Sequence, residues 1–462
     1  MPAPHKSGTL IKTVFGNAGW LLSGVPSAKS VEGVLPMRMT HTSTLSRFLC
    51  LIYLAALTAT SASAENWSCF RGPTRQGISN EKDIPTTWSP ASNILWRAPI
   101  PGEGWSSPIV FDDDVFVTTA ADGGASLRLL RINRLTGEVL WDKEIFRQKP
   151  GHKQPFNSYA SSTPATDGQK VYVLACDGTI LGVSLDGSVV WTNGDFEFYS
   201  EHGLAVSPVL YKDTLIIAFD GSSSGPDKYL GWQKPWDQAL ILALDKNTGM
   251  PRWKGRRGAS CIGHVTPLVV TENATDLLVS GAGNVVQGFD LNSGERIWTV
   301  SNAGEGVVPS LVGGDGLIFA TSGFGDPTIR AVRTGGKGDV TSTNIAWESK
   351  SDVPKIPSML YAKPHLFLVT ETGLAECIKA ATGEVLWTER LRGKHSASPV
   401  WADGRIYFLS EQGTTTVIDA ASEYKVVAVN ELNEKCCASP AVSHNSIFIR
   451  SDKNLYCIGK KQ

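Results

Sequence analysis

The chain has 462 residues, with 43 Lys and Arg against 44 Asp and Glu, and a formal net charge of −1. Because 42% of the residues are hydrophobic, the composition excludes a disordered chain, which needs low hydrophobicity and a strong net charge. The balanced charge also argues against a nucleic-acid-binding protein, which normally carries a basic excess or a basic stripe.

The N-terminal part of the chain has the features of a targeting segment. An apolar run at 48–58 follows two arginines and precedes an A-x-A cleavage pattern at 62–64. The run is too short to be a permanent membrane span, so we interpret 37–64 as a secretory signal peptide and expect the mature chain to begin at Glu65. Residues 1–36 are then a mis-assigned start or a disordered extension, and an uncleaved anchor is the alternative. Export places the protein in the periplasm or at the cell surface.

Seven cysteines follow the predicted signal peptide. An exported protein can form disulfides, but an odd number leaves at least one thiol free or paired outside the chain. No spacing resembles a zinc site, and the lack of a C-x-x-C-H motif excludes a covalent c-type haem. The seven are Cys69, Cys176, Cys261, Cys377, Cys436, Cys437 and Cys457.

The strongest signal in the sequence is a repeat. Each copy opens with a small residue beside a proline, followed by an alternating strand, and several copies end in a Gly turn and an apolar-Trp pair. The eight opening prolines lie 41 to 59 residues apart, at 108, 164, 208, 267, 309, 357, 399 and 440. The Gly-turn endings reach Trp141, Trp191, Trp253, Trp298 and Trp387, and the copy at Trp347 is degenerate. Eight copies at this spacing indicate a solenoid or a propeller.

Each copy divides into about four short strands with period-2 alternation and Gly, Asp or Asn turns, and no amphipathic helix is evident. Four-stranded units of this length are typical of propeller blades. We therefore predict an all-β, eight-bladed propeller of four-stranded antiparallel blades over 65–462. The last copy, 440–459, lacks its final strand, and the strand at 93–100 lacks the rest of its blade. Pairing of these two segments is expected to close the propeller.

The repeated Gly and Trp have structural roles in this prediction. The glycines at 137, 187, 249, 294 and 383 are expected at the positive-φ position of a hairpin turn. The Trp that follows is expected to pack between neighbouring blades as part of the core.

These motifs resemble the pyrroloquinoline quinone (PQQ)-like β-propeller repeat, which is shared by quinoprotein dehydrogenases and by BamB, the outer-membrane assembly lipoprotein. The opening W-x-x-F-R-G-P-x-x-x-G at 67–77 is similar to the start of a large group of secreted PQQ-like propellers from planctomycete-type bacteria. So are the stretches at 157–168, 202–213, 335–341 and 396–418. The resemblance covers 66–459 and implies the fold.

The same resemblance raises PQQ with calcium as a cofactor. Quinoprotein alcohol dehydrogenases hold the quinone and a Ca²⁺ in the central funnel, but they are longer, and the insertions between blades are few here, chiefly 142–160 and 221–239. Cys436 and Cys437 are adjacent, and a vicinal disulfide clamps the quinone in some of those enzymes. In this chain the pair is either such a disulfide or two half-buried thiols at a strand start. No cofactor-binding, metal-binding or catalytic residue is carried over.

The candidate binding residues lie where the innermost strands begin. His202, His264 and His395 each come just before an opening proline segment, and Trp105 and Asp220 occupy similar positions. Such side chains can line the mouth of the central channel, where propellers bind ligands, or they can be satisfied polar groups of the rim.

A separate candidate is the aromatic part of the longer insertion. Tyr229, Trp232 and Trp236 either form an exposed recognition loop or cap one face of the propeller.

Two functions follow from these observations. The first is an exported, non-catalytic propeller that acts as a scaffold or ligand-binding module for a protein or glycan partner in the cell envelope. The alternative is a small PQQ- and Ca-dependent dehydrogenase that oxidises an alcohol or sugar. For either we expect a monomer, no nucleic-acid partner, and no integral membrane span after signal cleavage.

Overall fold

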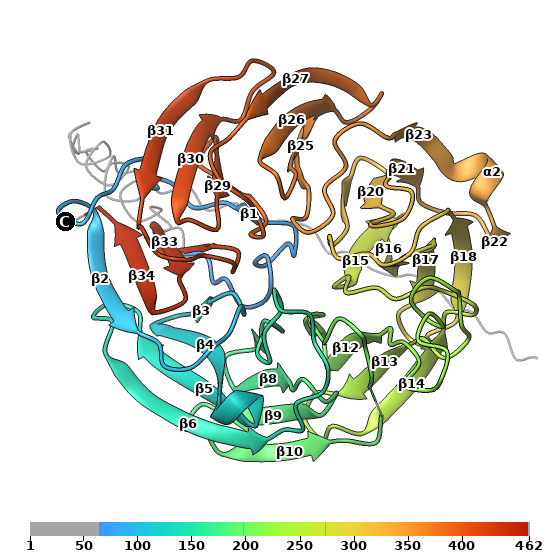
Figure 1. Ribbon diagram of the computed structural model, residues 1–462, viewed down its shortest axis with the longest axis horizontal. Helices are drawn as coiled ribbons and strands as arrows, with labels where there is room; N and C mark the ends of the chain where they lie inside the picture. Colours follow the sequence, from blue (N-terminus) through green and yellow to red (C-terminus); the bar gives the residue numbers. More distant parts are fainter. Residues whose placement is uncertain (1–63, 197, 273, 461–462) are drawn as a thin grey trace, which may run out of the picture. The chain divides into compact units, whose positions relative to one another are not determined.

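The computed structural model describes residues 64–196, 198–272 and 274–460. Residues 1–36 and the predicted signal peptide up to Ser63 lie outside this part of the chain. The described residues form eight sheets, and each is built on four antiparallel strands. The sheets are arranged as blades in a ring (Figure 1). The predicted eight-bladed all-β propeller is confirmed. Helix in the described part amounts to α2 (Thr341–Asn344) and the 3-10 turn η2 (Asp122–Gly124), and neither could cross a membrane.

The first four blades follow the chain in order. Blade 1 contains β3 (Ile109–Phe111), β4 (Asp114–Ala121), β5 (Ser126–Asn133) and β6 (Val139–Arg147). Blade 2 contains β7 (Ala165–Thr166), β8 (Lys170–Leu174), β9 (Ile180–Ser184) and β10 (Val189–Asn193). Blade 3 contains β11 (Val209–Tyr211), β12 (Thr214–Phe219), β13 (Leu240–Asp245) and β14 (Pro251–Arg256). Blade 4 contains β15 (Leu268–Glu272), β16 (Thr275–Ala282), β17 (Val285–Asp290) and β18 (Arg296–Ser301).

The remaining blades continue the same order. Blade 5 contains β19 (Val312–Gly314), β20 (Leu317–Thr321), β21 (Ile329–Arg333) and β23 (Ile345–Ser349). Blade 6 contains β24 (Leu360–Ala362), β25 (His365–Val369), β26 (Leu374–Lys379) and β27 (Glu384–Arg390). Blade 7 contains β28 (Val400–Ala402), β29 (Arg405–Leu409), β30 (Thr414–Asp419) and β31 (Val426–Glu431). Blade 8 contains β32 (Ala441–Ser443), β33 (Ser446–Arg450), β34 (Asn454–Gly459) and β2 (Ile94–Pro99).

The two ends of the propeller share blade 8. Strand β2 pairs antiparallel with β34, in a register that places Ile94 opposite Ile458 and Pro99 opposite Asn454. Figure 1 shows the early strand β2 lying beside the late strand β34. The predicted closure is confirmed, and it satisfies the outer edge of the last blade with a strand from the start of the domain.

A row of hydroxyl residues fixes the blades to one another around the channel. In each blade one Ser or Thr lies just before the innermost strand; we call these eight residues the hydroxyl collar. At seven junctions the collar residue's backbone N–H donates to the collar hydroxyl of the next blade, over 2.9 to 3.2 Å. The collar consists of Ser107, Thr163, Ser207, Thr266, Ser310, Ser358, Ser398 and Ser439.

Farther out, the repeated Trp residues join neighbouring blades as predicted. The indole N–H of Trp141 donates to Leu185 O of the next blade at 3.1 Å, and that of Trp253 donates to Leu291 O at 3.0 Å. Apolar side chains fill the space between blades; Phe116 of blade 1, for example, belongs to one buried cluster with residues of blade 2. Trp141 and Trp253 therefore each contribute both buried area and one directed hydrogen bond to the next blade.

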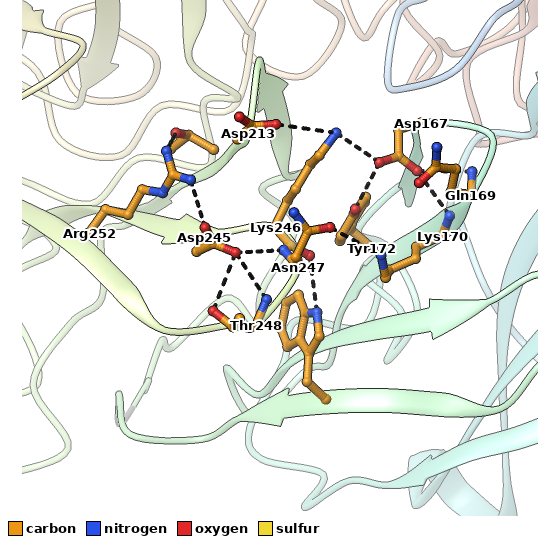
Figure 2. Close-up of polar contacts among 12 residues, drawn as sticks. Asp167, Gln169, Lys170, Tyr172, Asp213, Asp245, Lys246, Asn247, Thr248 and Arg252 are labelled. Atoms are coloured by element: carbon orange, nitrogen blue, oxygen red, sulfur yellow. Dashed lines mark hydrogen bonds and ion pairs between the residues drawn. The ribbon is translucent and has the colours of Figure 1, made fainter.

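The turn that accepts the Trp hydrogen bond is stabilised by hydrogen bonds to its own polar side chains (Figure 2). After β13, Asp245 Oδ1 accepts the backbone N–H groups of Asn247 at 2.9 Å and Thr248 at 3.1 Å. Lys246 O accepts the Trp191 indole N–H at 3.1 Å, while Lys246 Nζ lies 3.0 Å from Asp167 of blade 2. The five predicted turn glycines have φ between 72° and 85°, which confirms their left-handed conformation.

Blade 5 departs from this pattern at the degenerate copy before Trp347. Here β22 (Gly338–Asp339) pairs in parallel with β18 of blade 4, and α2 follows where blades 1 to 4 and blade 6 have a glycine hairpin. The Trp298 indole N–H of blade 4 is consequently buried without a partner.

Gly249 allows a test of the Trp–turn contact. An added Cβ would lie 2.4 Å from Trp191 Cε3, and φ is 72°, so we expect Gly249→Ala to destabilise the fold through both strain and a clash. Gly404→Ala is the matched control, because its φ is 75° and nothing lies within 4 Å of the added Cβ. Urea unfolding should show a loss of about 1 kcal/mol for the control and clearly more for Gly249→Ala. Equal losses would contradict the role assigned to the Trp contact.

Candidate functional site

The segment that resembles the start of secreted propellers crosses one end of the central channel. Trp67 exchanges two backbone hydrogen bonds with Val110 of blade 1 (2.8 and 2.9 Å), and Gly77 O accepts the N–H of Trp401 of blade 7 at 2.8 Å. Strand β1 (Ile78–Ser79) then pairs in parallel with β28. In Figure 1 the blue segment around β1 lies at the centre of the ring.

Five contacts of this segment fall at the same level. Val110, Thr166, Leu210, Gly313 and Trp401 lie three residues beyond the collar residue of their blades, and each has a backbone group that bonds to the segment. Residues 67–79, which we call the closing segment, therefore close one end of the channel. This is the end that the innermost strands approach as they run from the collar.

Arg71 fixes the closing segment from within. Its side chain is 1% exposed, and Nη2 donates to Gln76 O and to Met359 O of blade 6, both at 2.7 Å. Burial without a carboxylate partner lowers the pKa of Arg71 to about 9.

On the opposite side of the collar the channel widens into a cavity of about 410 Å³. Its wall is mostly apolar and includes Phe156, Ile262, Val307 and Phe324. Below it lies a smaller chamber of about 130 Å³, which is lined by seven of the eight collar residues and by Phe70 of the closing segment. The cavity is thus open at one mouth and blind at the other end.

Eight residues line both spaces and form the boundary between them. Each lies two positions before the collar residue of its blade, so the alternation of an extended chain directs both side chains toward the axis. We call this set the floor octet. It consists of Trp105, Ser161, Ala205, His264, Val308, Ile356, Ser396 and Cys437.

Three of the five residues predicted to line the channel mouth come together here. Trp105 and His264 belong to the floor octet, and His202 lines the upper cavity. The His202 ring lies 6.1 Å from the His264 ring and 5.1 Å from the Trp232 ring, in edge-to-face geometry. Of the other six members of the floor octet, Cys437 was singled out from the sequence only as part of a possible vicinal disulfide, and the remaining five were not identified. The position two residues before each collar hydroxyl would have found them all.

The other two candidates lie away from the cavity. Asp220 is fully buried in an ion pair with Arg257, at 2.6 Å between Oδ1 and Nε, and burial raises its pKa. His395 is three positions before its collar residue, so its side chain faces away from the axis, and burial lowers its pKa to about 4. Neither lines the cavity or the chamber.

The aromatic insertion supplies part of the wall. Trp232 faces the cavity, Tyr229 stacks against it at 6.1 Å with 52% of its surface exposed, and Trp236 pairs with Ser260 in an antiparallel bridge. The insertion is therefore packed against the connection between blades 3 and 4 and forms part of the cavity wall. The other predicted insertion, 142–160, begins within strand β6, which runs to Arg147.

The adjacent cysteines have different environments because successive residues face opposite sides. Cys437 belongs to the floor octet, whereas Cys436 is buried and its Sγ contacts Glu434 O at 3.5 Å. Both are free thiols in this structure, and the vicinal disulfide stays a prediction. Burial raises the pKa of Cys437 to about 12, so this thiol is protonated at neutral pH.

The cavity carries little charge. Among the described residues of its lining, Glu305 is the single ionisable carboxylate, and its Oε2 accepts a hydrogen bond from Gln233 at 3.1 Å. No Lys or Arg of the described part of the chain lines the cavity or the chamber; Lys435 lies outside, 4.8 Å from the Trp105 ring centre. Burial, followed by the nearby His202, lowers the pKa of His264 to about 3, so the imidazole is neutral.

The lining does not fit a quinone with calcium. Ca²⁺ takes six to eight oxygen ligands, whereas the cavity offers one carboxylate, and the described residues contain no group of three His, Cys, Asp or Glu suited to a metal. PQQ is a tricarboxylate, and nothing in the lining would neutralise its charges.

Comparisons with known proteins agree with the fold. A family model described as outer membrane protein assembly factor BamB matches residues 148–225, 235–346 and 336–426, more than half of the chain. BamB from Moraxella catarrhalis superimposes with a TM-score of 0.56 at 15% identity, covering 80% of this chain and 98% of its own. A europium-containing methanol dehydrogenase gives 0.59 at 12% identity, covering 83% of this chain and 89% of its own.

A computationally designed protein, Ika8, gives a TM-score of 0.51 at 12% identity over 83% of this chain and 99% of its own. At these identities the likeness concerns the fold alone. No curated protein matches the sequence at a significant level.

The neutral, buried His264 predicts a pH dependence of stability. An unfolded histidine takes up a proton near pH 6.5, but His264 in the fold does so only near pH 3, so this contribution is complete above pH 6.5 and is lost as the pH falls toward 3. Each such histidine adds a slope of about 1.4 kcal/mol per pH unit in that window. Urea unfolding of His264→Gln should show a shallower slope between pH 6 and 4 than the wild type.

His152→Gln is the control for this measurement, because the His152 side chain is 55% exposed. Because this side chain is exposed to solvent in the fold, the substitution should change the slope less than His264→Gln does. An unaltered slope in His264→Gln would show that His264 is protonated in the fold.

Proposed function

This chain belongs to the family described as outer membrane protein assembly factor BamB, and we propose that it is an exported propeller that acts as a binding module or scaffold in the periplasm or cell envelope. The observation that carries the proposal is the blind cavity above the floor octet. The floor octet takes one residue from the same register position of each of the eight blades. Its volume of about 410 Å³ lies in the range of small-molecule and side-chain pockets.

The walls favour a ligand with an apolar, flat body. Trp105, Trp232, Phe156 and Phe324 present aromatic rings to the upper cavity, and Ile262 and Val307 lie between them. Burying an apolar group against such walls gains about 25 cal/mol per Å² removed from water. The polar side chains Asn157 and Ser161 already bond to each other at 2.6 Å, so they compete little for the ligand.

The chamber below favours an oxygen acceptor at the inner end of the ligand. Seven collar hydroxyl oxygens each accept a backbone N–H, and no collar hydroxyl in the described part of the chain donates to a protein acceptor. The Trp105 indole N–H is also buried without a partner. These hydrogens need acceptors, and a ligand oxygen in the chamber would supply one.

The charge of the residues that line the cavity and the chamber distinguishes a neutral ligand from an anionic one. Within the part of the chain that the structure describes, no Lys or Arg lines either space, so a carboxylate would lose its hydration without gaining a counter-charge. We therefore propose an uncharged ligand group: an aromatic or aliphatic body with a terminal hydroxyl or carbonyl. A free small molecule and a side chain of a partner protein could both provide this chemistry.

The alternative, a small PQQ- and Ca-dependent dehydrogenase, has less support. The likeness to methanol dehydrogenase extends to the fold, and the lining lacks the oxygen donors and positive charges that quinone and calcium would need. Export is supported by the signal-like segment 37–64 and by the family, whose description concerns the assembly of outer membrane proteins.

The ligand class is tested with three matched probes: toluene, p-cresol and 4-methylbenzoate, titrated by calorimetry and ligand-observed NMR. We expect p-cresol to bind roughly fivefold to tenfold more tightly than toluene, because one net hydrogen bond contributes about 1 kcal/mol. The carboxylate should bind most weakly. Trp105→Phe, which removes the unpaired N–H, should lower the preference for p-cresol, whereas Trp232→Phe in the upper wall should leave it intact.

Equal binding of toluene and p-cresol would contradict the role of the chamber, and tighter binding of 4-methylbenzoate would contradict the neutral ligand. Saturable, calcium-dependent binding of PQQ would favour the dehydrogenase instead. A protein partner is detected separately by a photo-crosslinking residue in place of the exposed Phe156, with the exposed Met250, which lies in the turn before the outer strand β14, as the control position. Adducts at position 156 alone are expected for a partner at the cavity.

A further inference from the structure

The first residue of the predicted mature chain is held by residues distant in sequence. The Glu65 carboxylate accepts hydrogen bonds from Ser79 Oγ and Asn80 N, both at 2.9 Å. The Glu65 carbonyl accepts one from Ser443 Oγ of blade 8, and the Glu65 backbone nitrogen donates to Glu81 Oε1 at 2.5 Å. This residue is therefore fixed through its side chain and both of its backbone groups.

The acceptor of that last hydrogen bond is a buried carboxylate without a counter-charge. Glu81 is 7% exposed, its Oε2 accepts the N–H of Asn445 at 2.9 Å, and none of the ion pairs between described residues includes it. His444 is its neighbour, but burial, and then Arg134, lower the pKa of this imidazole, which leaves it neutral at pH 7. A buried carboxylate that has only amide donors is costly to keep ionised.

Signal cleavage would change the charge at this point. Hydrolysis of the Ala64–Glu65 peptide bond adds the water oxygen to the Ala64 carbonyl carbon and a hydrogen to the Glu65 nitrogen. The amine released takes up a proton at neutral pH, because an α-amino group has a pKa near 8. The donor beside Glu81 then changes from a neutral amide to an ammonium.

We propose that cleavage before Glu65 creates an ion pair between the new α-ammonium group and the Glu81 carboxylate, so that removal of the leader locks the closing segment onto the last blade. The proposal rests on the export proposed above. Two independent observations support this ion pair. One is the A-x-A pattern that ends at Ala64, and the other is the hydrogen bond from the Glu65 nitrogen to the buried Glu81 carboxylate.

The position of the pair gives it a structural consequence. Ser443 and Asn445 lie at the turn between β32 and β33 of blade 8, the blade that joins both ends of the propeller. Residues 67–79 continue from the pair across the blind end of the channel. A stronger contact at Glu65 therefore stabilises both the closure of the propeller and the seal of the chamber, and it does so only after processing.

The test uses the full chain, exported and processed in cells, with two changes combined in a double-mutant cycle. One is insertion of a single glycine between Ala64 and Glu65, which moves the ammonium one residue, about 3.8 Å, away from Glu81. The other is Glu81→Gln, which removes the carboxylate charge. In the wild type the insertion should lower the folded-to-unfolded ratio about tenfold, and in Glu81→Gln it should have little effect.

The reactivity of the α-amine gives a readout that does not depend on stability. Acylation of this group by an N-hydroxysuccinimide ester at pH 7 should be slower in the wild type than in either single variant, because the ion pair keeps the amine protonated and covered. An equal effect of the insertion in both backgrounds, or no effect in either, would overturn the ion pair.

N-terminal sequencing of the processed protein separates the two proposals. A first residue other than Glu65 overturns the cleavage site and the inference together. Glu65 at the N-terminus without coupling to Glu81 overturns the inference alone and leaves the exported binding module standing.

Discussion

The hydrogen bond from one collar residue to the next is the constraint on which the rest of this propeller depends. Seven backbone N–H groups bind the hydroxyl of the following blade, which holds the eight innermost strands at one height around the channel. The number of residues from the collar then determines the height along the axis of the floor octet and of the closing segment. Side chains two residues before it form the floor octet, and backbone groups three residues after it receive the closing segment. A slip of one residue in a single blade would turn a floor side chain away from the axis.

The same constraint explains the chemistry of the cavity. The collar hydroxyl oxygens accept backbone N–H groups, so the O–H groups are available to donate into a small chamber, and the described residues that line this chamber include no carboxylate. Above the chamber, aromatic and aliphatic side chains line a mostly apolar space in which the histidines are neutral. The result is a blind pocket that is apolar at its mouth and rich in donors at its base. This arrangement suits recognition of an uncharged group better than it suits a quinone and a metal.

The architecture could be predicted from the sequence because its signals repeat. The spacing of the opening prolines predicted the number of blades, and the incomplete copy at 440–459 indicated which strand closes the last blade. Gly249 indicated a turn that requires φ > 0 at that position. The site was only partly predictable. Trp105, His202 and His264 were recognised because aromatic and imidazole groups stand out, whereas Ala205 and Val308 carry no chemical signal by themselves. His395 and Asp220 were expected at the channel, but position relative to the collar, and not nearness to a proline, decides which way a side chain faces.

The most direct test of this account is amide hydrogen exchange of the collar, measured by NMR in the wild type and in Ser358→Ala. The account predicts that the collar amides exchange only through global unfolding, and that Ser358→Ala selectively accelerates exchange at Ser310, whose N–H loses its acceptor. Exchange at Ser398, which keeps its acceptor Ser439, should be affected much less. Collar amides that exchange as fast as those of the outer strands, or an unchanged rate at Ser310 in the variant, would contradict the claim that the collar holds the propeller together.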